Sequence, residues 1–523
     1  MSLATRYLPH ALIFFSSACI MVVELVGGRL VARHLGSSLY TWTSIIGVVL
    51  AGMSIGNMVG GRLADRYRPR AMLGWLFILA SAACLLSLYL NSIFSGDSPL
   101  SGMHWPGRVF LTMAIVFLVP ALILGTISPV TAKMALEGSQ KMGRTIGSVY
   151  AWGAVGSIVG TFATGFWLVA ALGAQGVVLS IALGLALVGL LLGPRRWVHS
   201  LWIVSVLAAV VLVCLPSARA VELAVSLGLR EDAADTHFAT DSNYQFVKVY
   251  GKSVPDATAP GGERKLRVLA LDYLIHGYID PKDPTYLHYE YERVYRAISL
   301  EMLGRRKQIS AFFIGGGSYT FPRWVLARWP GSAVEVAEID PLVLEANHAA
   351  LGLARDTPIR THLLDARNAV DDLPPDRRFD LIYGDAYSDL SVPQHLVTYE
   401  FTRKLAQHLD PRGGYMINII DKYSTGLFLC AVVNTMRRVF PHVLVFASGR
   451  YGVTGGRDTF VVVGTRVAVD TSRWEPGHTS GRPGSALSKA AMESLEQRCG
   501  GRILTDDDAP VENLLLPVVR SRR

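Results

Sequence analysis

The strongest constraint on the fold of this chain is a series of seven apolar stretches within its first 216 residues. They cover approximately residues 8–30, 40–61, 71–94, 108–132, 146–170, 174–193 and 197–216. A helix needs about 20 apolar residues to cross the hydrocarbon core of a bilayer, and each stretch reaches that length. With 51% hydrophobic and 17% charged residues, the chain is too apolar for a wholly soluble or disordered protein. The sequence therefore predicts a transmembrane domain of about seven helices over residues 1–216.

The charges of the chain are unevenly distributed. Residues 1–216 contain 13 basic residues (Lys and Arg) but only 4 acidic ones (Asp and Glu). Residues 217–523 contain 37 basic and 37 acidic residues. The basic residues cluster in the loops after the second, fourth and sixth stretches: Arg62, Arg66, Arg68, Arg70, Lys133, Lys141, Arg144, Arg195 and Arg196. By the positive-inside rule these loops face the cytoplasm. We therefore predict a multi-pass protein of the cell (inner) membrane that contacts the lipid bilayer. We predict no nucleic-acid partner, because the soluble half has no basic stripe.

The five cysteines suggest neither cross-links nor metal binding. Cys19, Cys84 and Cys214 lie inside apolar stretches, whereas Cys430 and Cys499 stand alone. A Cys-x-x-Cys pair or a zinc-ligand spacing is absent. The sequence therefore predicts no disulfide and no metal site.

After residue 216 the pattern becomes that of an α/β protein. We expect a linker at 217–237, a small β lead-in with a connecting helix at 238–308, and a tail at 466–523 with a flexible segment. Between 309 and 465, apolar runs alternate with segments of helical length and period. The predicted strands cover 247–250, 266–271, 311–314, 334–339, 359–364, 379–383 and 415–420. This order predicts a Rossmann-like, doubly wound sheet of the S-adenosylmethionine-methyltransferase type, with mostly parallel strands.

Glycines and acids follow four successive strands of the predicted sheet. The first strand runs into Gly315, Gly316 and Gly317, and the next three end near Glu338, Asp365 and Asp385. Ligands bind at the carboxyl ends of strands in such sheets, and a carboxylate there can accept hydrogen bonds from ribose hydroxyls. The Gly-x-Gly-x-x-Gly fingerprint and a basic partner for a pyrophosphate are both absent. The pattern therefore favours a nucleoside without phosphates, as in S-adenosyl compounds.

These motifs resemble those of the spermidine synthase (polyamine aminopropyltransferase) family, from residue 241 to about 465, and the whole chain resembles its membrane-fused bacterial members. The matching segments are Tyr244-Gln245, Leu271-Asp272, Gly315-Gly316-Gly317, Glu338-Ile339-Asp340, Asp365-Ala366 and Asp385. With one inserted residue, Asp389 and Pro393 take the places of the last acid and the proline in the family's Asp-x-x-Asp-Pro loop.

The resemblance implies transfer of the aminopropyl group of decarboxylated S-adenosylmethionine to putrescine or a similar amine. The donor would be a co-substrate, with no bound cofactor, and the protein could form a homodimer. The implied donor-binding residues are Gln245, Gly315, Gly316, Gly317, Glu338, Asp365, Ala366 and Pro393. Asp385 would be the catalytic base, and Asp385, Asp389 and Tyr289 would bind the acceptor. The segment 504–512 resembles the closing segment of membrane-fused members; it would either dock near the mouth of the site or form a solvated acidic turn.

Two departures from the family pattern leave other functions open. Ser318 replaces the acid that follows the triple glycine and binds the donor's ammonium group, and Tyr289 replaces a histidine. A lost charged hydrogen bond costs about 1.5 to 3 kcal/mol. The alternatives are an S-adenosylmethionine-dependent methyltransferase, or a polyamine-binding or transport protein with a degenerate synthase domain. Residues 60–70 resemble a cytoplasmic loop motif of major facilitator transporters.

The side of the membrane on which the soluble part lies is a separate question. A cytoplasmic N-terminus and seven crossings would put residues 217–523 outside, where S-adenosyl donors are not expected. The segment around Pro120 and Pro129 could instead be re-entrant, which would return this part of the chain to the cytoplasm.

Overall fold

The computed structural model describes residues 3–94, 99–100, 102–137, 141–193, 196–215, 217–230, 235–387, 392–448, 456–470 and 486–520. The chain forms two compact units, Met1–Phe246 and Val247–Arg522. Asp389 and the Gly/Ser/Arg-rich residues 471–485 lie outside the described residues.

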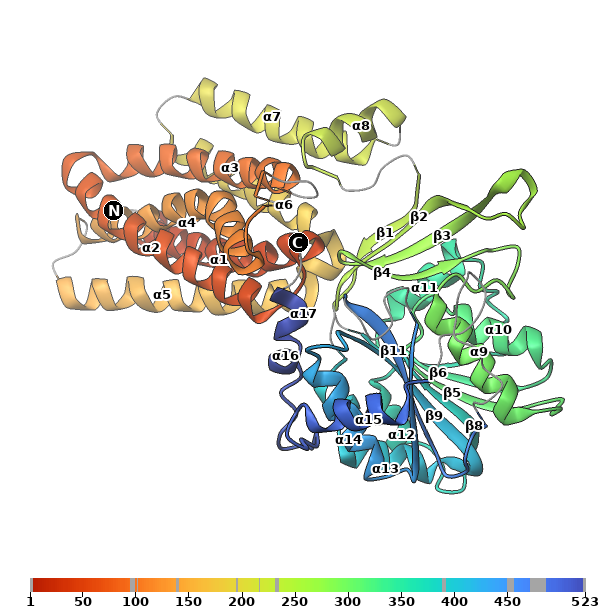
Figure 1. Cartoon of the computed structure of the whole chain (residues 1–523). Coiled ribbons are helices and arrows are strands. Elements are labelled where there is room, and N and C mark those ends of the chain that lie inside the picture. Colours follow the sequence, from red (N-terminus) through yellow and green to blue (C-terminus); the bar gives the residue numbers. More distant parts are fainter. Residues whose placement is uncertain are drawn as a thin grey trace. The chain divides into compact units, whose positions relative to one another are not determined.

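The first unit is helical, as the apolar stretches predict. Its elements are α1 (Leu3–Leu35), α2 (Leu39–Arg66), α3 (Pro69–Phe94), α4 (Trp105–Glu137), α5 (Met142–Ala163), the π-helix η1 (Thr164–Leu168), α6 (Val169–Leu192), α7 (Arg196–Cys214) and α8 (Ala218–Ser226). Strand β1 (Thr236–Asp241) follows them. Within the described residues, six helices are long and apolar enough to cross a membrane. The multi-span class is therefore confirmed (Figure 1).

The fifth of these apolar helices, Met142–Leu192, is 51 residues long and is broken at Gly173. At about 1.5 Å per residue it would extend for about 76 Å, more than twice the roughly 30 Å of a bilayer core. Gly173 has the non-helical angles φ 69° and ψ 162°, and the side chain of Asp241 accepts a hydrogen bond from the next amide, Ala174 N, at 2.8 Å. The two predicted stretches 146–170 and 174–193 meet at this break. A count of seven crossings remains a prediction.

Glycines allow close packing of the helices in the first unit. A Cβ atom on Gly56 of α2 would lie 2.2 Å from the carbonyl oxygen of Leu122 in α4. A Cβ on Gly156 of α5 would lie 2.2 Å from that of Phe14 in α1. These glycines therefore lie where helix backbones approach closely, as small residues do in membrane helices.

The second unit contains the predicted β lead-in. Strands β2 (Phe246–Pro255), β3 (Glu263–Leu271) and β4 (Leu274–Ile279) form antiparallel pairs. The short 3-10 helix η2 (Pro260–Gly262) lies in the predicted turn between β2 and β3. Helix α9 (Glu290–Leu303) then connects this sheet to the large one.

The large sheet has seven strands in the order β10-β11-β9-β8-β5-β6-β7. Its parallel strands are β5 (Ser310–Ile314), β6 (Ala333–Ala337), β7 (Arg360–His362), β8 (Phe379–Gly384) and β9 (Leu409–Asp421). They confirm the five strands predicted between 311 and 420. At one edge, β11 (Asp458–Thr465) and β10 (His442–Ala447) add antiparallel strands that the sequence analysis missed. Their valine-rich runs were a readable signal.

Helices cover both faces of this sheet, which makes it a Rossmann-like domain. One apolar core contains side chains of α9, α10 (Thr320–Arg328) and the sheet. The other contains side chains of α12 (Ala366–Asp371), η3 (Gln394–Leu396), α13 (Tyr399–Gln407), α14 (Leu427–Arg437) and the C-terminal segment. Figure 1 shows α9, α10 and α11 (Pro341–Ala350) beside one face and α12, α13 and α14 beside the other.

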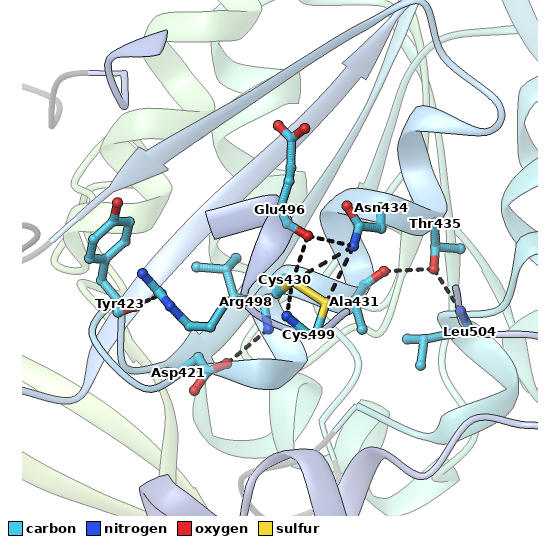
Figure 2. Close-up of a disulfide and its surroundings, with 11 residues drawn as sticks. Asp421, Tyr423, Cys430, Ala431, Asn434, Thr435, Glu496, Arg498, Cys499 and Leu504 are labelled. Atoms are coloured by element: carbon cyan, nitrogen blue, oxygen red, sulfur yellow. Dashed lines mark hydrogen bonds between the residues drawn. A yellow bond between two sulfur atoms is a disulfide. The ribbon is translucent and has the colours of Figure 1, made fainter. Parts of the chain in front are cut away.

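The predicted absence of a disulfide is wrong. Cys430 in α14 and Cys499, which follows α15 (Lys489–Gln497), form a disulfide with their Cα atoms 6.0 Å apart (Figure 2). Polar contacts accompany it: the Asn434 side chain donates to the carbonyl of Glu496 at 3.2 Å. The two cysteines are 69 residues apart in the sequence, so only the return of the C-terminal segment to α14 brings them together. The short helices α16 (Val511–Leu514) and α17 (Leu516–Arg520) follow.

Candidate functional site

The topology places a ligand crevice beside β5. From β5 the chain continues to β6 and β7 on one side and then crosses to β8 on the other. Ligands bind at such a switch point, outside the carboxyl ends of the strands. The glycine turn follows β5 and Asp385 follows β8, so two of the predicted groups lie at the switch point.

The glycine turn is closely packed against the strand ends beside it. Gly315 has φ 92°, and a Cβ there would lie 2.6 Å from the carbonyl oxygen of Asp385. A Cβ on Gly316 would lie 2.6 Å from the ring of Tyr319. Side chains at these positions would clash, which explains the glycines and keeps the backbone open to a ligand.

The side chain of Glu338 lies next to the glycine turn. Its Oε2 accepts a hydrogen bond from Gly316 N and its Oε1 accepts one from Asp340 N, both at 2.9 Å. The side chain is buried, and burial raises its pKa above the usual value although these amides act in the opposite direction. Asp340 itself caps α11 by accepting from Leu342 N at 2.9 Å.

Asp365 and Ala366 lie at the start of α12. The Oδ1 atom of Asp365 accepts a hydrogen bond from Arg367 N at 2.9 Å, which caps the helix, and its Oδ2 lies 2.8 Å from His395 Nε2. Arg367 forms two hydrogen bonds with Asp506 of the closing segment, at 2.8 and 2.5 Å. The closing segment therefore docks beside Asp365 and Ala366.

The catalytic base that the sequence analysis proposed, Asp385, is held by two neutral donors. Its Oδ2 accepts a hydrogen bond from Tyr291 Oη at 2.8 Å, and its Oδ1 accepts one from Asn418 Nδ2 at 2.9 Å. Burial raises the pKa of Asp385 from 3.8 to about 6, although the two donors lower it. A carboxylate with this pKa is better matched to proton transfer near neutral pH than an ordinary aspartate.

Two cavities meet at Asp385. The larger has a volume of about 440 Å³ and is lined mainly by aromatic and polar side chains: Tyr273, Leu274, Ile275, His276, Tyr289, Tyr291, Asp385, Tyr387, Asn418, Ile420, Arg457, Asp458 and Thr459. Tyr289 Oη donates to the carbonyl of Ile275 at 2.9 Å, and Tyr387 Oη to that of Asn418 at 2.6 Å. Their rings are therefore fixed as walls, and tyrosine faces attract cations.

The smaller cavity has a volume of about 30 Å³. Its lining includes the glycine turn, Ser318, Tyr291, Glu292 and Asp385. Ser318 is buried, and its hydroxyl shares a hydrogen bond with Thr320 Oγ1 at 2.6 Å. Asp385, Tyr291 and His276 line both cavities, so a group in one lies next to a group in the other.

Not every predicted site residue joins this group. Gln245 belongs to the first unit, where its backbone N–H donates to Ser242 Oγ at 2.9 Å. Pro393 immediately precedes η3, and Asp389 lies outside the described residues. The roles of these three residues remain predictions. Within the described ranges, no group of three or more His, Cys, Asp or Glu is placed to hold a metal ion.

Three further residues of the site were not predicted from the sequence. Tyr291 and Asn418 hold Asp385, and Glu292 lines the smaller cavity. An asparagine in the apolar run 415–420 was a signal, because a buried polar side chain needs a partner. Nothing in the local pattern marked Glu292.

Fold and site together define a Rossmann-like domain with a candidate ligand site at its switch point. No family model matches the chain. A polyamine aminopropyltransferase of Vibrio vulnificus (strain CMCP6) is 27% identical over 164 residues, which cover 31% of this chain and 52% of that protein. A probable polyamine aminopropyl transferase of Bifidobacterium longum (strain NCC 2705) is 25% identical over 221 residues, or 39% of this chain and 48% of that protein.

An "eEF1A lysine and N-terminal methyltransferase" of Danio rerio is 27% identical over 164 residues, which cover 30% of this chain and 23% of that protein. The chain thus spans between 23% and 52% of the length of these three relatives. The matches relate the chain to the spermidine synthase family and confirm the resemblance carried by its motifs.

Proposed function

We propose that the chain is a membrane-anchored polyamine aminopropyltransferase. It would transfer the aminopropyl group of decarboxylated S-adenosylmethionine to putrescine or a similar amine, giving spermidine and methylthioadenosine. The observation that carries the proposal is the tyrosine-walled cavity that ends at Asp385, which also borders the glycine turn. Such a cavity suits an alkylamine whose reacting nitrogen must lie beside both a base and the donor.

The chemistry requires a base because an alkylamine has a pKa near that of lysine, about 10.4, and arrives protonated. Asp385 accepts the proton that leaves the nitrogen. The nitrogen lone pair then forms a bond to the aminopropyl carbon next to the sulfonium, and the carbon–sulfur bond breaks with its electron pair remaining on sulfur. Holding both substrates in line supplies much of the acceleration in such a displacement.

A methyltransferase is the second candidate. The methyltransferase relative and the neutral Ser318 favour it, because an acid at position 318 would repel the carboxylate that a methyl donor keeps. In that case the donor would be intact S-adenosylmethionine.

The membrane unit anchors this activity in a bilayer. In this proposal the break at Gly173 gives seven crossings. The second unit then lies on the side of the membrane opposite to the basic loops. The Cys430–Cys499 disulfide supports that side, because disulfides persist in oxidising compartments and are rare in the cytosol. The donor would then have to be delivered across the membrane.

The decisive experiment uses the full chain in detergent with putrescine and either donor. Release of methylthioadenosine from the decarboxylated donor, together with formation of spermidine, supports the proposal. Methyl transfer from intact S-adenosylmethionine would replace it with the second candidate. Failure to bind either donor in calorimetry would leave a binding or transport protein with a degenerate domain.

A further inference from the structure

The donor of the proposed reaction carries a positive charge at the end of its aminopropyl chain, and the glycine turn lacks the acid that binds this group in the family. Ser318 stands at that position. Its hydroxyl is already shared with Thr320 at 2.6 Å. A Cβ on Gly277 would lie 1.9 Å from Ser318 Oγ, so the side chain is enclosed from the other side as well. Ser318 therefore offers an ammonium group no charge.

A different acid lines the same cavity. Glu292 in α9 is only 3% exposed and faces the cavity that Ser318 and the glycine turn also line. The volume of about 30 Å³ is enough for a small polar group, because a single water needs only about 10 to 15 Å³ of this kind of space. An ammonium group is of similar size.

Local structure explains only part of the position of Glu292. Its Oε2 accepts a hydrogen bond from Tyr289 N at 3.3 Å, which caps the start of α9. Over the described residues, Oε1 accepts no hydrogen bond and Glu292 forms no ion pair. A buried carboxyl group without a cationic partner is costly in a folded protein. Helix capping needs only one acceptor atom, and a glutamine would supply it.

The groups around Glu292 make the cavity suited to a cation. Asp385 lines it too, and together with burial it raises the pKa of Glu292 to about 8. His276 also lines the cavity, and burial lowers its pKa to about 4, so it stays neutral. Arg293 lowers the pKa of Glu292, but its effect is smaller than those of burial and Asp385. An incoming ammonium group would favour the ionised form of Glu292 by direct charge attraction.

We propose that Glu292 binds the ammonium group at the end of the donor's aminopropyl chain, in place of the acid that the family carries at the position of Ser318. This inference rests on the proposed function and adds a reason for donor choice. The tail of the decarboxylated donor carries only an ammonium group, whereas that of S-adenosylmethionine also carries a carboxylate. The ionised Asp385 in the same small cavity repels that carboxylate, which selects against the second donor.

The test measures the affinity of the full chain in detergent for three ligands: decarboxylated S-adenosylmethionine, S-adenosylmethionine and methylthioadenosine. Glu292→Gln keeps an oxygen to cap α9 and removes only the charge. We expect it to weaken binding of the decarboxylated donor by about 10- to 100-fold. Binding of methylthioadenosine, which has no ammonium group, should stay unchanged. Glu301→Gln on an exposed position of the same helix is the matched control and should change neither affinity.

The other outcomes separate a failure of this inference from a failure of the proposed function. Equal losses for the decarboxylated donor and methylthioadenosine would show that Glu292 is structural and overturn the inference. An unchanged donor affinity in Glu292→Gln would also overturn it, while leaving the proposed function intact. If the wild-type chain binds methylthioadenosine or S-adenosylmethionine but not the decarboxylated donor, the proposed function itself fails.

Discussion

Replacing Asp385 with asparagine should slow catalysis strongly and stabilise the folded chain at the same time. The asparagine oxygen can still accept from Asn418, and the Tyr291 hydroxyl, which now donates to Asp385, can rotate to accept from the new amide. The site should therefore keep its shape. Because general-base catalysis contributes about 10²- to 10⁴-fold, kcat should fall by a factor in that range.

The stability gain follows from the pKa of the carboxyl group. In the folded chain this pKa rises from 3.8 to about 6, and one pKa unit corresponds to 1.36 kcal/mol. Above pH 6 the wild-type chain therefore loses up to roughly 3 kcal/mol of folding free energy through this raised pKa. The loss shrinks as the pH falls from 6 towards 4, because both folded and unfolded states then bind the proton. Asparagine avoids the cost of ionisation.

Two measurements check this reasoning. Thermal unfolding of wild type and Asp385→Asn at pH 7.5 and pH 4.5 should show a higher midpoint for the variant at pH 7.5 and a smaller difference at pH 4.5. Spermidine formation at saturating substrates gives kcat. A variant that unfolds at a lower temperature at pH 7.5, or that keeps more than about a tenth of the activity, would refute the argument.

Three further predictions concern other parts of the chain. Tyr291→Phe removes a donor that lowers the pKa of Asp385, so the acidic limb of the kcat/KM profile should move to higher pH; an unmoved limb would contradict the assignment of Asp385. Cys430→Ser should lower the free energy of unfolding by about 4 kcal/mol, as expected for a loop of this length, and a reductant should destabilise the wild type but not the variant. Alkylation before and after reduction should detect the bond between Cys430 and Cys499. A reporter fused after Arg523 should be active only outside the cytoplasm, and cytoplasmic activity would rule out seven crossings.

Much of the fold was predictable because its signals are local. A run of about 20 apolar residues has few alternatives to a membrane helix, and the short apolar runs between 311 and 420 mark the five parallel strands. The glycine turn and Asp385 were predictable as neighbours because parallel strands end at one edge of their sheet. The valine-rich edge strands β10 and β11 were equally local and were overlooked.

Other features depended on contacts between distant parts of the chain. Tyr291 and Asp385 are 94 residues apart, and Asn418 and Asp385 are 33 apart. Their meeting requires α9 to pack on one face of the sheet and β9 to lie next to β8. Cys430 and Cys499 are joined for a similar reason, since the C-terminal segment returns to α14.

The amino-acid sequence alone determined that apolar helices precede a Rossmann-like domain, and which strand ends carry glycine or acid. The sequence carries this information in the spacing of residues along the chain, because hydrophobic periodicity is read within one helix or strand at a time. The tertiary structure alone decided that Tyr291 and Asn418 hold Asp385, and that Glu292 lines the small cavity together with Ser318 and Asp385. Burial and hydrogen bonding between distant residues are set by the packing of whole elements, which spacing in one sequence does not encode.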